Sequence, residues 1–449
     1  MSARLWSIEG RRTLALWLVP PLLVLCFRTY GDRFTPTVPL WILSSVAIGQ
    51  AATIIGPPLG GIAAWMAGRE RRRGVGELLA TMVHPALARL IPTWAATTRW
   101  GLLIYVLFAL GGGVETARRA TWGGPDPWVI LAGAAAIVVY GAIGFAVGVT
   151  VPGRFTAPLV ALGLLAGQWL LAMPLLRSAA PWRYLSPVAA LDSTVWYGPL
   201  PAIAPLVILV YLGVLGSIWA LLSLWLSRFR ARRSWLALAL ALILLVGGTA
   251  QTLAQVSPAP SGPSEQYRGA ALLPYTPVCR PAPIEVCVHP AYQPWLEQLS
   301  VEINTLLAPL VGVPGLPTRA EQVSPDGRAS GTTSILPFPL DQRTLYSAEQ
   351  YAIECAVFDC AANFQRVPPS PPHISGGDAR VAIARWLRLR LGRPPEGPYS
   401  RYCFAPPGQD TPCAASERFA ALPPEAQHAW LVAHFADLRA GRLTLEELP

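Results

Sequence analysis

Long apolar runs dominate the first 255 residues and are separated by short polar stretches rich in arginine. A helix of about 20 mostly apolar residues crosses a bilayer core about 30 Å thick. Seven runs approach or exceed that length, near residues 13–28, 38–67, 91–112, 128–151, 155–176, 203–226 and 235–254. The pattern predicts a polytopic α-helical membrane protein, with about six to seven transmembrane helices within residues 1–254.

Two of these runs contain adjacent prolines, which lack a backbone N–H and interrupt helices. Pro20 and Pro21 fall in the first run and Pro57 and Pro58 in the second, so we expect both helices to be broken there. A cleavable signal peptide is the alternative for the first run. The diproline and the absence of a small-residue cleavage site after Phe27 favour a retained membrane helix.

The apolar runs stop near residue 255, and the chain then becomes rich in proline, serine and glycine. We expect a linker over residues 255–290 and a separate domain over 291–449. Apolar residues at helical spacing predict helices near 291–310, near 378–391, and from Pro423 or Pro424 to about Gly441. Short strands are expected at 333–338 and 351–358, which makes this Pro-rich domain mainly α.

Charge divides the chain at the same place. Residues 1–255 hold 20 arginines and 7 acidic residues, whereas residues 256–449 hold 15 arginines and 18 acidic residues. Arginines concentrate in cytoplasmic loops of membrane proteins, which explains the basic half better than nucleic-acid binding does. Most loop arginines fall on the side of the N-terminus, so we expect that end in the cytoplasm of a bacterial cell. Seven crossings of the plasma membrane then make the C-terminal domain extracytoplasmic.

All 35 basic residues are arginine, and the chain contains no lysine. A phosphate-binding loop of the usual kind needs its lysine, and a Schiff-base enzyme needs an amine. We therefore expect no ATP site and no cofactor in this chain.

Six cysteines lie in the second half, and disulfides between them would require an oxidising compartment. Fifteen connectivities are possible. Proximity in sequence favours three local pairs, Cys279 with Cys287, Cys355 with Cys360, and Cys403 with Cys413. Buried or metal-binding thiols are the alternative, although no CxxC spacing is present.

Ionisable residues are almost absent from the apolar runs, which argues against an ion-coupled carrier and for an externally powered one. The polar residues there are Gln50, Thr53 and Gln168. Hydrogen bonds between helices explain the two glutamines better than contact with a substrate.

The stretch Gly68–Trp100 begins with a basic cluster, continues into a short amphipathic segment and leads into the third apolar run. Here the chain resembles the ABC-2 type transporter permeases. The residues that carry the resemblance are Glu70 with Arg71, Arg72 and Arg73, the glycines Gly74 and Gly76, the run Glu77, Leu78 and Leu79, and Pro85. Val75 departs from the threonine or serine common in that family. The resemblance covers roughly residues 10–230, mostly as topology.

The resemblance implies a permease subunit that works as a homo- or heterodimer, and whose cytoplasmic segment 68–90 docks on a separate ATP-binding subunit. The expected contact consists of Arg71, Arg72, Glu77, Leu78 and Leu79. A purely structural elbow at the membrane interface is the alternative. The seventh run and the C-terminal domain exceed the family's six-helix pattern.

Two other classes of protein compete with the permease. One is a membrane-anchored extracytoplasmic binding or assembly protein without transport activity. The other, a membrane-tethered hydrolase, has less support, because the sequence contains neither HExxH nor GxSxG. We therefore expect a protein that is not itself an enzyme.

Overall fold

The computed structural model describes residues 15–35, 40–74, 86–172, 197–199, 203–227, 232–256, 270–273, 275–322, 333–336, 352–353, 356–358, 379–390 and 410–449. The chain folds as two compact units, unit 1 from Met1 to Leu273 and unit 2 from Pro274 to Pro449.

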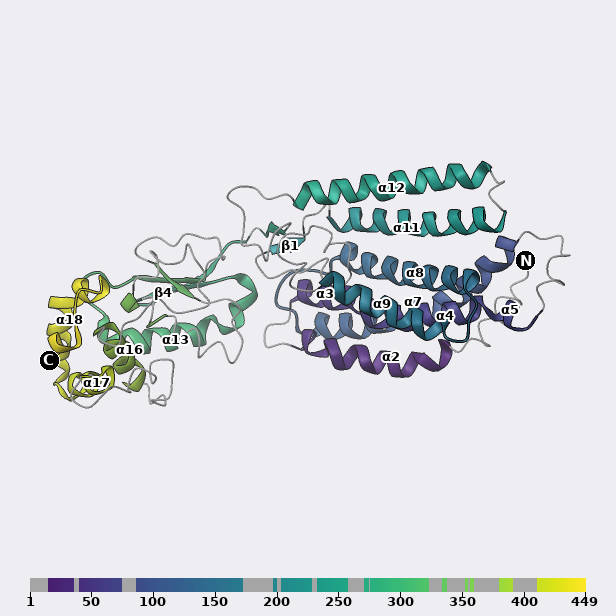
Figure 1. Ribbon diagram of the computed structural model, residues 1–449. Coiled ribbons are helices and arrows are strands. Elements are labelled where there is room, and N and C mark those ends of the chain that lie inside the picture. The colour runs from purple at the N-terminus through teal and green to yellow at the C-terminus, as the bar shows by residue number, and fades with distance from the viewer. Residues whose placement is uncertain are drawn as a thin grey trace. The chain divides into compact units, whose positions relative to one another are not determined.

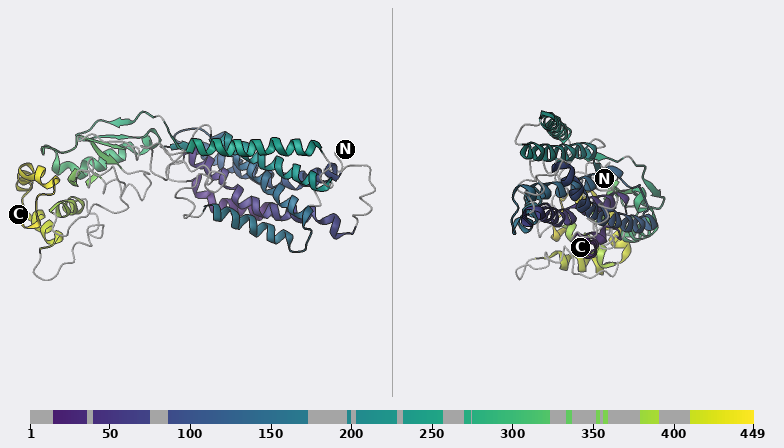
Figure 2. Two further views of the ribbon diagram at one scale, coloured as in Figure 1. Left: turned by 45° about the horizontal axis from the view of Figure 1, so that its top comes forward. Right: turned by 90° about the vertical axis from the view of Figure 1, so that its right-hand side faces the viewer.

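Unit 1 is a bundle of helices that run alongside one another (Figure 1). The end-on view in Figure 2 shows these helices in cross-section. The helices are α2 (Ala15–Tyr30), α3 (Trp41–Gln50), α4 (Ala52–Ala67), α5 (Arg69–Arg72), α7 (Ala86–Arg119), α8 (Pro127–Thr150), α9 (Thr156–Ala172), α11 (Ile203–Leu226) and α12 (Arg232–Val256). Two short strands, β1 (Tyr197–Pro199) and β2 (Ala270–Leu272), pair antiparallel.

Five segments of the described chain are long and apolar enough to cross a bilayer: Trp41–Ala67, Leu87–Arg119, Pro127–Thr150, Ile203–Leu226 and Ser234–Gln255. Large apolar side chains are exposed on the helices, for example Leu110, Leu159 and Ile243, at 60%, 66% and 66%. Water would disfavour so much exposed apolar surface, whereas lipid accommodates it. The predicted helical membrane protein is confirmed.

The other two predicted spans are shorter. Helix α2 has 16 residues and contains Pro20 and Pro21. The apolar part of α9 covers Thr156–Leu170. Helix α7, in contrast, has 34 residues and extends beyond the predicted 91–112 at both ends. A topology of seven crossings remains a prediction.

The irregularity in the second span lies upstream of its prolines. Pro57 and Pro58 sit inside α4, and the chain turns at Ala51, between α3 and α4. Proline removes the hydrogen bond to the carbonyl four residues earlier and its ring crowds that turn, so the distortion falls on the preceding residues. The expectation that each helix breaks at its diproline is therefore corrected, since α2 likewise continues through Pro20 and Pro21.

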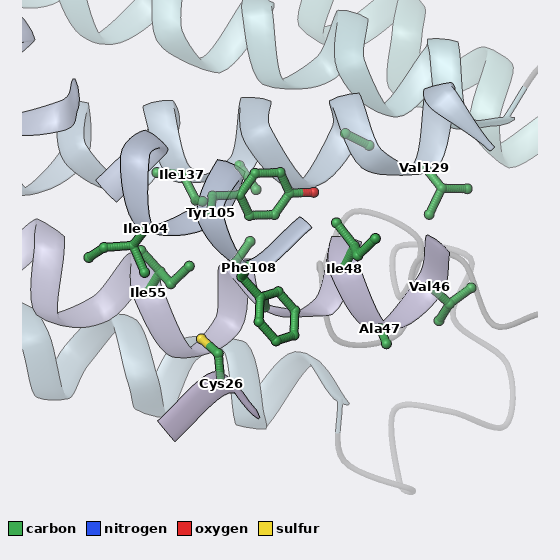
Figure 3. Close-up of a cluster of buried hydrophobic side chains, with 14 of the residues drawn as sticks. Cys26, Val46, Ala47, Ile48, Ile55, Ile104, Tyr105, Phe108, Val129 and Ile137 are labelled. Atoms are coloured by element: carbon green, nitrogen blue, oxygen red, sulfur yellow. The ribbon is translucent and has the colours of Figure 1, made fainter. Parts of the chain in front are cut away.

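The core of the bundle lies where α2, α3, α4, α7 and α8 meet (Figure 3). Phe108 and Ile137 are fully buried there, next to Ile55 and Cys26. Tyr105 on α7 crosses to α8 and donates to the carbonyl of Ile130 at 2.7 Å. This hydrogen bond satisfies the buried hydroxyl, as is usual for polar groups in an apolar core.

Glycines bring the backbone of α8 unusually close to that of α3 and α4. A Cβ at Gly144 would lie 2.0 Å from the carbonyl oxygen of Gly60, and one at Gly148 would lie 2.2 Å from that of Ala64. Gly133 meets Gly49 in the same way, with 2.8 Å to its Cα. Small residues at such spacing allow close packing of membrane helices, so this seam fixes α8 against the second span.

Unit 2 combines helices with a four-stranded mixed sheet. The strands are β3 (Val278–Arg280), β4 (Glu285–Val288), β5 (Arg319–Gln322) and β6 (Thr333–Leu336), in that order. β3 and β4 are antiparallel, and the other neighbours are parallel. The helices are α13 (Leu296–Leu307), α16 (Ala379–Arg390), α17 (Pro412–Ala421) and α18 (Pro424–Arg439).

Several expectations for this half are met and others are corrected. The helices expected near 291–310, near 378–391 and after Pro423 are confirmed as α13, α16 and α18, and a strand occurs at 333–336. The strand expected at 351–358 is wrong, because its described residues 352–353 and 356–358 are helical. Strands β3 and β4 fall within 255–290, so the folded unit starts inside the predicted linker.

Candidate functional site

The basic cluster follows α4 directly. Gly68 links α4 to α5, and Gly74 ends the described part with φ at +67°, a backbone conformation that suits glycine. Cζ of Arg72 lies 3.8 Å from the centroid of the Trp65 ring, and its Nη2 donates to the carbonyl of Trp65. Arg72 is therefore held against the end of α4.

The neighbouring arginine reaches a different helix. Cζ of Arg71 lies 5.9 Å from the centroid of the Trp225 ring, near the end of α11. Cation–π contacts of this kind contribute about 0.5–1 kcal/mol at exposed sites. The cluster is thereby attached to α4 and α11, and a displacement of α5 would act on both.

Other chain turns lie at the same end of the bundle. A Cβ at Gly68 would be 3.4 Å from the carbonyl oxygen of Gly148 and 3.5 Å from Pro152, in the turn between α8 and α9. That turn contains Arg154. At the opposite end, Asp126 caps α8 and Glu115 pairs with Arg119 at 2.7 Å. The described arginines at the α5 end thus exceed those at the other end.

Glu77, Leu78 and Leu79 lie outside the described residues, so their predicted role in the contact stays a prediction. Gln50 is the last residue of α3 and is half-buried.

Gln168 is buried and connects three helices. Its Nε2 donates to the backbone carbonyl of Thr53 on α4 at 2.9 Å, and its Oε1 accepts from the hydroxyl of Tyr140 on α8 at 3.0 Å. The Thr53 hydroxyl in turn lies 3.1 Å from that of Tyr30 on α2. Gln168 therefore links α9 to α4 through its amide nitrogen and to α8 through its amide oxygen.

The prolines of α4 explain why that carbonyl is available. In a regular helix the carbonyl of Thr53 would accept from the N–H of residue 57, which here is proline. A freed carbonyl inside a bilayer needs another donor, and Gln168 supplies it. The pair permits a locally distorted α4 without leaving a polar group unpaired.

Cysteines of unit 2 form disulfides, which indicate whether the unit lies in an oxidising compartment. Cys279 and Cys287 form a disulfide between directly paired residues of β3 and β4, as predicted. Cys413 is also disulfide-bonded, and Cys355, Cys360 and Cys403 lie outside the described residues. Glu285 lies beside the Cys279 and Cys287 sulfurs, but a sulfur engaged in a disulfide is not a thiolate ligand for a metal.

His289 follows the disulfide strand and acts as a structural residue. Its ring Nδ1 accepts from the backbone N–H of Ala291 at 3.1 Å, and the backbone N–H of His289 donates to Oε1 of Gln322 at 3.0 Å. Burial lowers the pKa of His289 to about 4, because the charged imidazole is poorly solvated there. The ring is therefore neutral near pH 7.

Comparisons with protein families, with curated proteins and with solved structures found no match for this chain.

Proposed function

We propose that the chain is the transmembrane permease subunit of an ABC-2-like exporter, working as a homo- or heterodimer. A separate subunit binds and hydrolyses ATP, and segment 68–90 couples that hydrolysis to movement of the membrane helices. The chain itself carries no cofactor and is not the enzyme.

The observation that carries this proposal is the attachment of the basic cluster to two membrane helices. Arg72 contacts Trp65 on α4, and Arg71 contacts Trp225 on α11. A short segment joined to both helices can convert a displacement by a partner into a tilt of the bundle. The positive charges also suit an acidic surface on that partner.

Two features support an orientation with α5 in the cytoplasm of a bacterial cell. Arginines gather at the α5 end of the bundle, as they do in cytoplasmic loops. After α12 the chain passes through β2 at the other end, where β2 pairs with β1 ahead of α11. The disulfides of unit 2 then lie in an extracytoplasmic, oxidising compartment.

The double variant Glu77→Arg with Leu78→Asp is expected to abolish co-purification of an ATP-binding subunit while leaving membrane insertion intact. It reverses a charge and introduces another at the centre of the proposed contact, and mismatched charges across an interface are strongly unfavourable. The measurement is recovery of a polypeptide that carries a phosphate-loop lysine and an ABC signature, after affinity purification of the full chain from membranes.

Asp32→Arg is the matched control, because Asp32 lies in a short 3-10 helix at the opposite end of the bundle. It should leave recovery unchanged. If the double variant recovers as much of the ATP-binding polypeptide as the unaltered chain does, segment 68–90 has no coupling role. That result would favour the alternative, a membrane-anchored extracytoplasmic binding or assembly protein.

A further inference from the structure

Unit 2 contains a pocket of about 400 Å³ at the junction of α13, α16 and α18. Pockets for small organic ligands start at about 300 Å³. The lining residues include Ala308, Pro309, Arg390, Pro424, Gln427 and His428. The size is therefore that of a site for a small molecule.

The floor of the pocket is apolar and well packed. Leu306, Trp386 and Leu387 are exposed by 2% or less. Gln427 is fixed from behind, since its Nε2 donates to the carbonyls of Phe419 and Leu422, each at 2.9 Å. Fixed side chains give a cavity that exists before a ligand arrives, which lowers the entropic cost of binding.

The ionisable side chains among the described lining residues are all basic. Arg390 is exposed at the end of α16, with its Cζ 5.5 Å from the centroid of the Trp386 ring. Nδ1 of His428 lies 3.3 Å from the carbonyl of Pro309. Arg390 and His428 are the ionisable residues among the described lining residues, and neither is acidic. Glu425, in the first turn of α18, is not among them.

The accessible part of the lining combines Arg390 with Ala308, Pro309 and Pro424. A guanidinium beside small and apolar side chains suits a carboxylate with an apolar body.

We propose that this pocket binds a small organic carboxylate, with its apolar body against Ala308, Pro309 and Pro424 and its carboxylate paired with Arg390. The site is independent of the coupling role of segment 68–90. It gives unit 2 a ligand-binding role of its own, whether or not the chain transports anything.

The test measures binding of benzoate to the full chain in lipid nanodiscs by ligand-observed NMR. We expect saturable binding in the millimolar range that a ligand of this size reaches. Benzylammonium, with the opposite charge on a similar body, is expected not to bind. Arg390→Gln should weaken benzoate binding at least about tenfold, because it removes a charge-assisted pair.

Arg442→Gln is the control, since Arg442 is an exposed arginine of unit 2 that does not line the pocket. It should bind benzoate like the unaltered chain. Ala308→Trp is a second variant, expected to fill the pocket and abolish binding without removing a buried side chain. No saturable benzoate binding, or binding that neither Arg390→Gln nor Ala308→Trp weakens, would overturn the proposal.

Discussion

Replacing Gly144 with valine is expected to prevent α8 from packing on α4 and to leave the chain without a stable helix bundle. The new Cβ would lie 2.0 Å from the carbonyl oxygen of Gly60, and the obstacle is backbone, so no side-chain rotation can relieve it. Overpacking of a well-packed core typically costs about 1–3 kcal/mol. We expect the upper end of that range or more, because both helices would have to separate.

Gly163→Val is the matched control, because a Cβ at Gly163 on α9 meets nothing within 4 Å. The measurement compares the thermal unfolding midpoint of both variants with that of the unaltered chain, in the same detergent. Gly163→Val should stay close to the unaltered chain, and Gly144→Val should unfold at a much lower temperature or elute as an aggregate. Similar midpoints for the two variants would contradict the close approach of α4 and α8.

Replacing Gln168 with leucine is expected to destabilise the bundle by about 1–3 kcal/mol, the cost of an unsatisfied buried polar group. The Thr53 carbonyl loses its donor, because Pro57 has no N–H to offer. Pro57→Ala restores that N–H. In the Pro57→Ala background the same Gln168→Leu change should therefore cost clearly less.

A double-mutant cycle measures this difference in the free energy of unfolding. The hydroxyl of Tyr140 loses its acceptor in both backgrounds, so the difference isolates the Thr53 carbonyl. Pro58→Ala is the control background, because it restores a donor to the carbonyl of Ile54 instead. Equal costs of Gln168→Leu in all three backgrounds would show that Gln168 does not compensate for Pro57.

The membrane helices were predictable from sequence because each is a local run of apolar residues. The expected span 203–226 coincides with α11 (Ile203–Leu226), and the expected span 128–151 is shifted by one residue from α8 (Pro127–Thr150). Helix α18 was equally readable, because Pro424 starts it and Gly441, with φ at +69°, follows its end.

Elements of unit 2 that escaped prediction have weak local signals. Strands β3, β4 and β5 have three or four residues, too few for an alternating pattern to stand out. Helix α17 is rich in alanine, which blurs its apolar face. The sequence does contain a start signal for α17, because a threonine followed by a proline is typical of a helix N-terminus. In the structure the hydroxyl of Thr411 accepts from the N–H of Ala414 at 3.1 Å.

The hydrogen bond between Gln168 and Thr53 could not be predicted from the sequence pattern. Gln168 and Thr53 are 115 residues apart, so only the packing of α9 on α4 brings them together. The unpaired carbonyl could be predicted, because Pro57 has no N–H to donate to the carbonyl of Thr53. The sequence did not indicate that Gln168 is the donor that replaces it.

The most direct test of coupling places a photoreactive amino acid at position 77 of the full chain, in intact bacterial cells. Illumination is expected to cross-link this position to an ABC ATP-binding polypeptide on the cytoplasmic side. The same amino acid in place of Asp32, at the opposite end of the bundle, should not capture that polypeptide. Cross-links from position 77 to lipid alone, or reaction of this position with a reagent that cannot cross the membrane, would contradict the permease role.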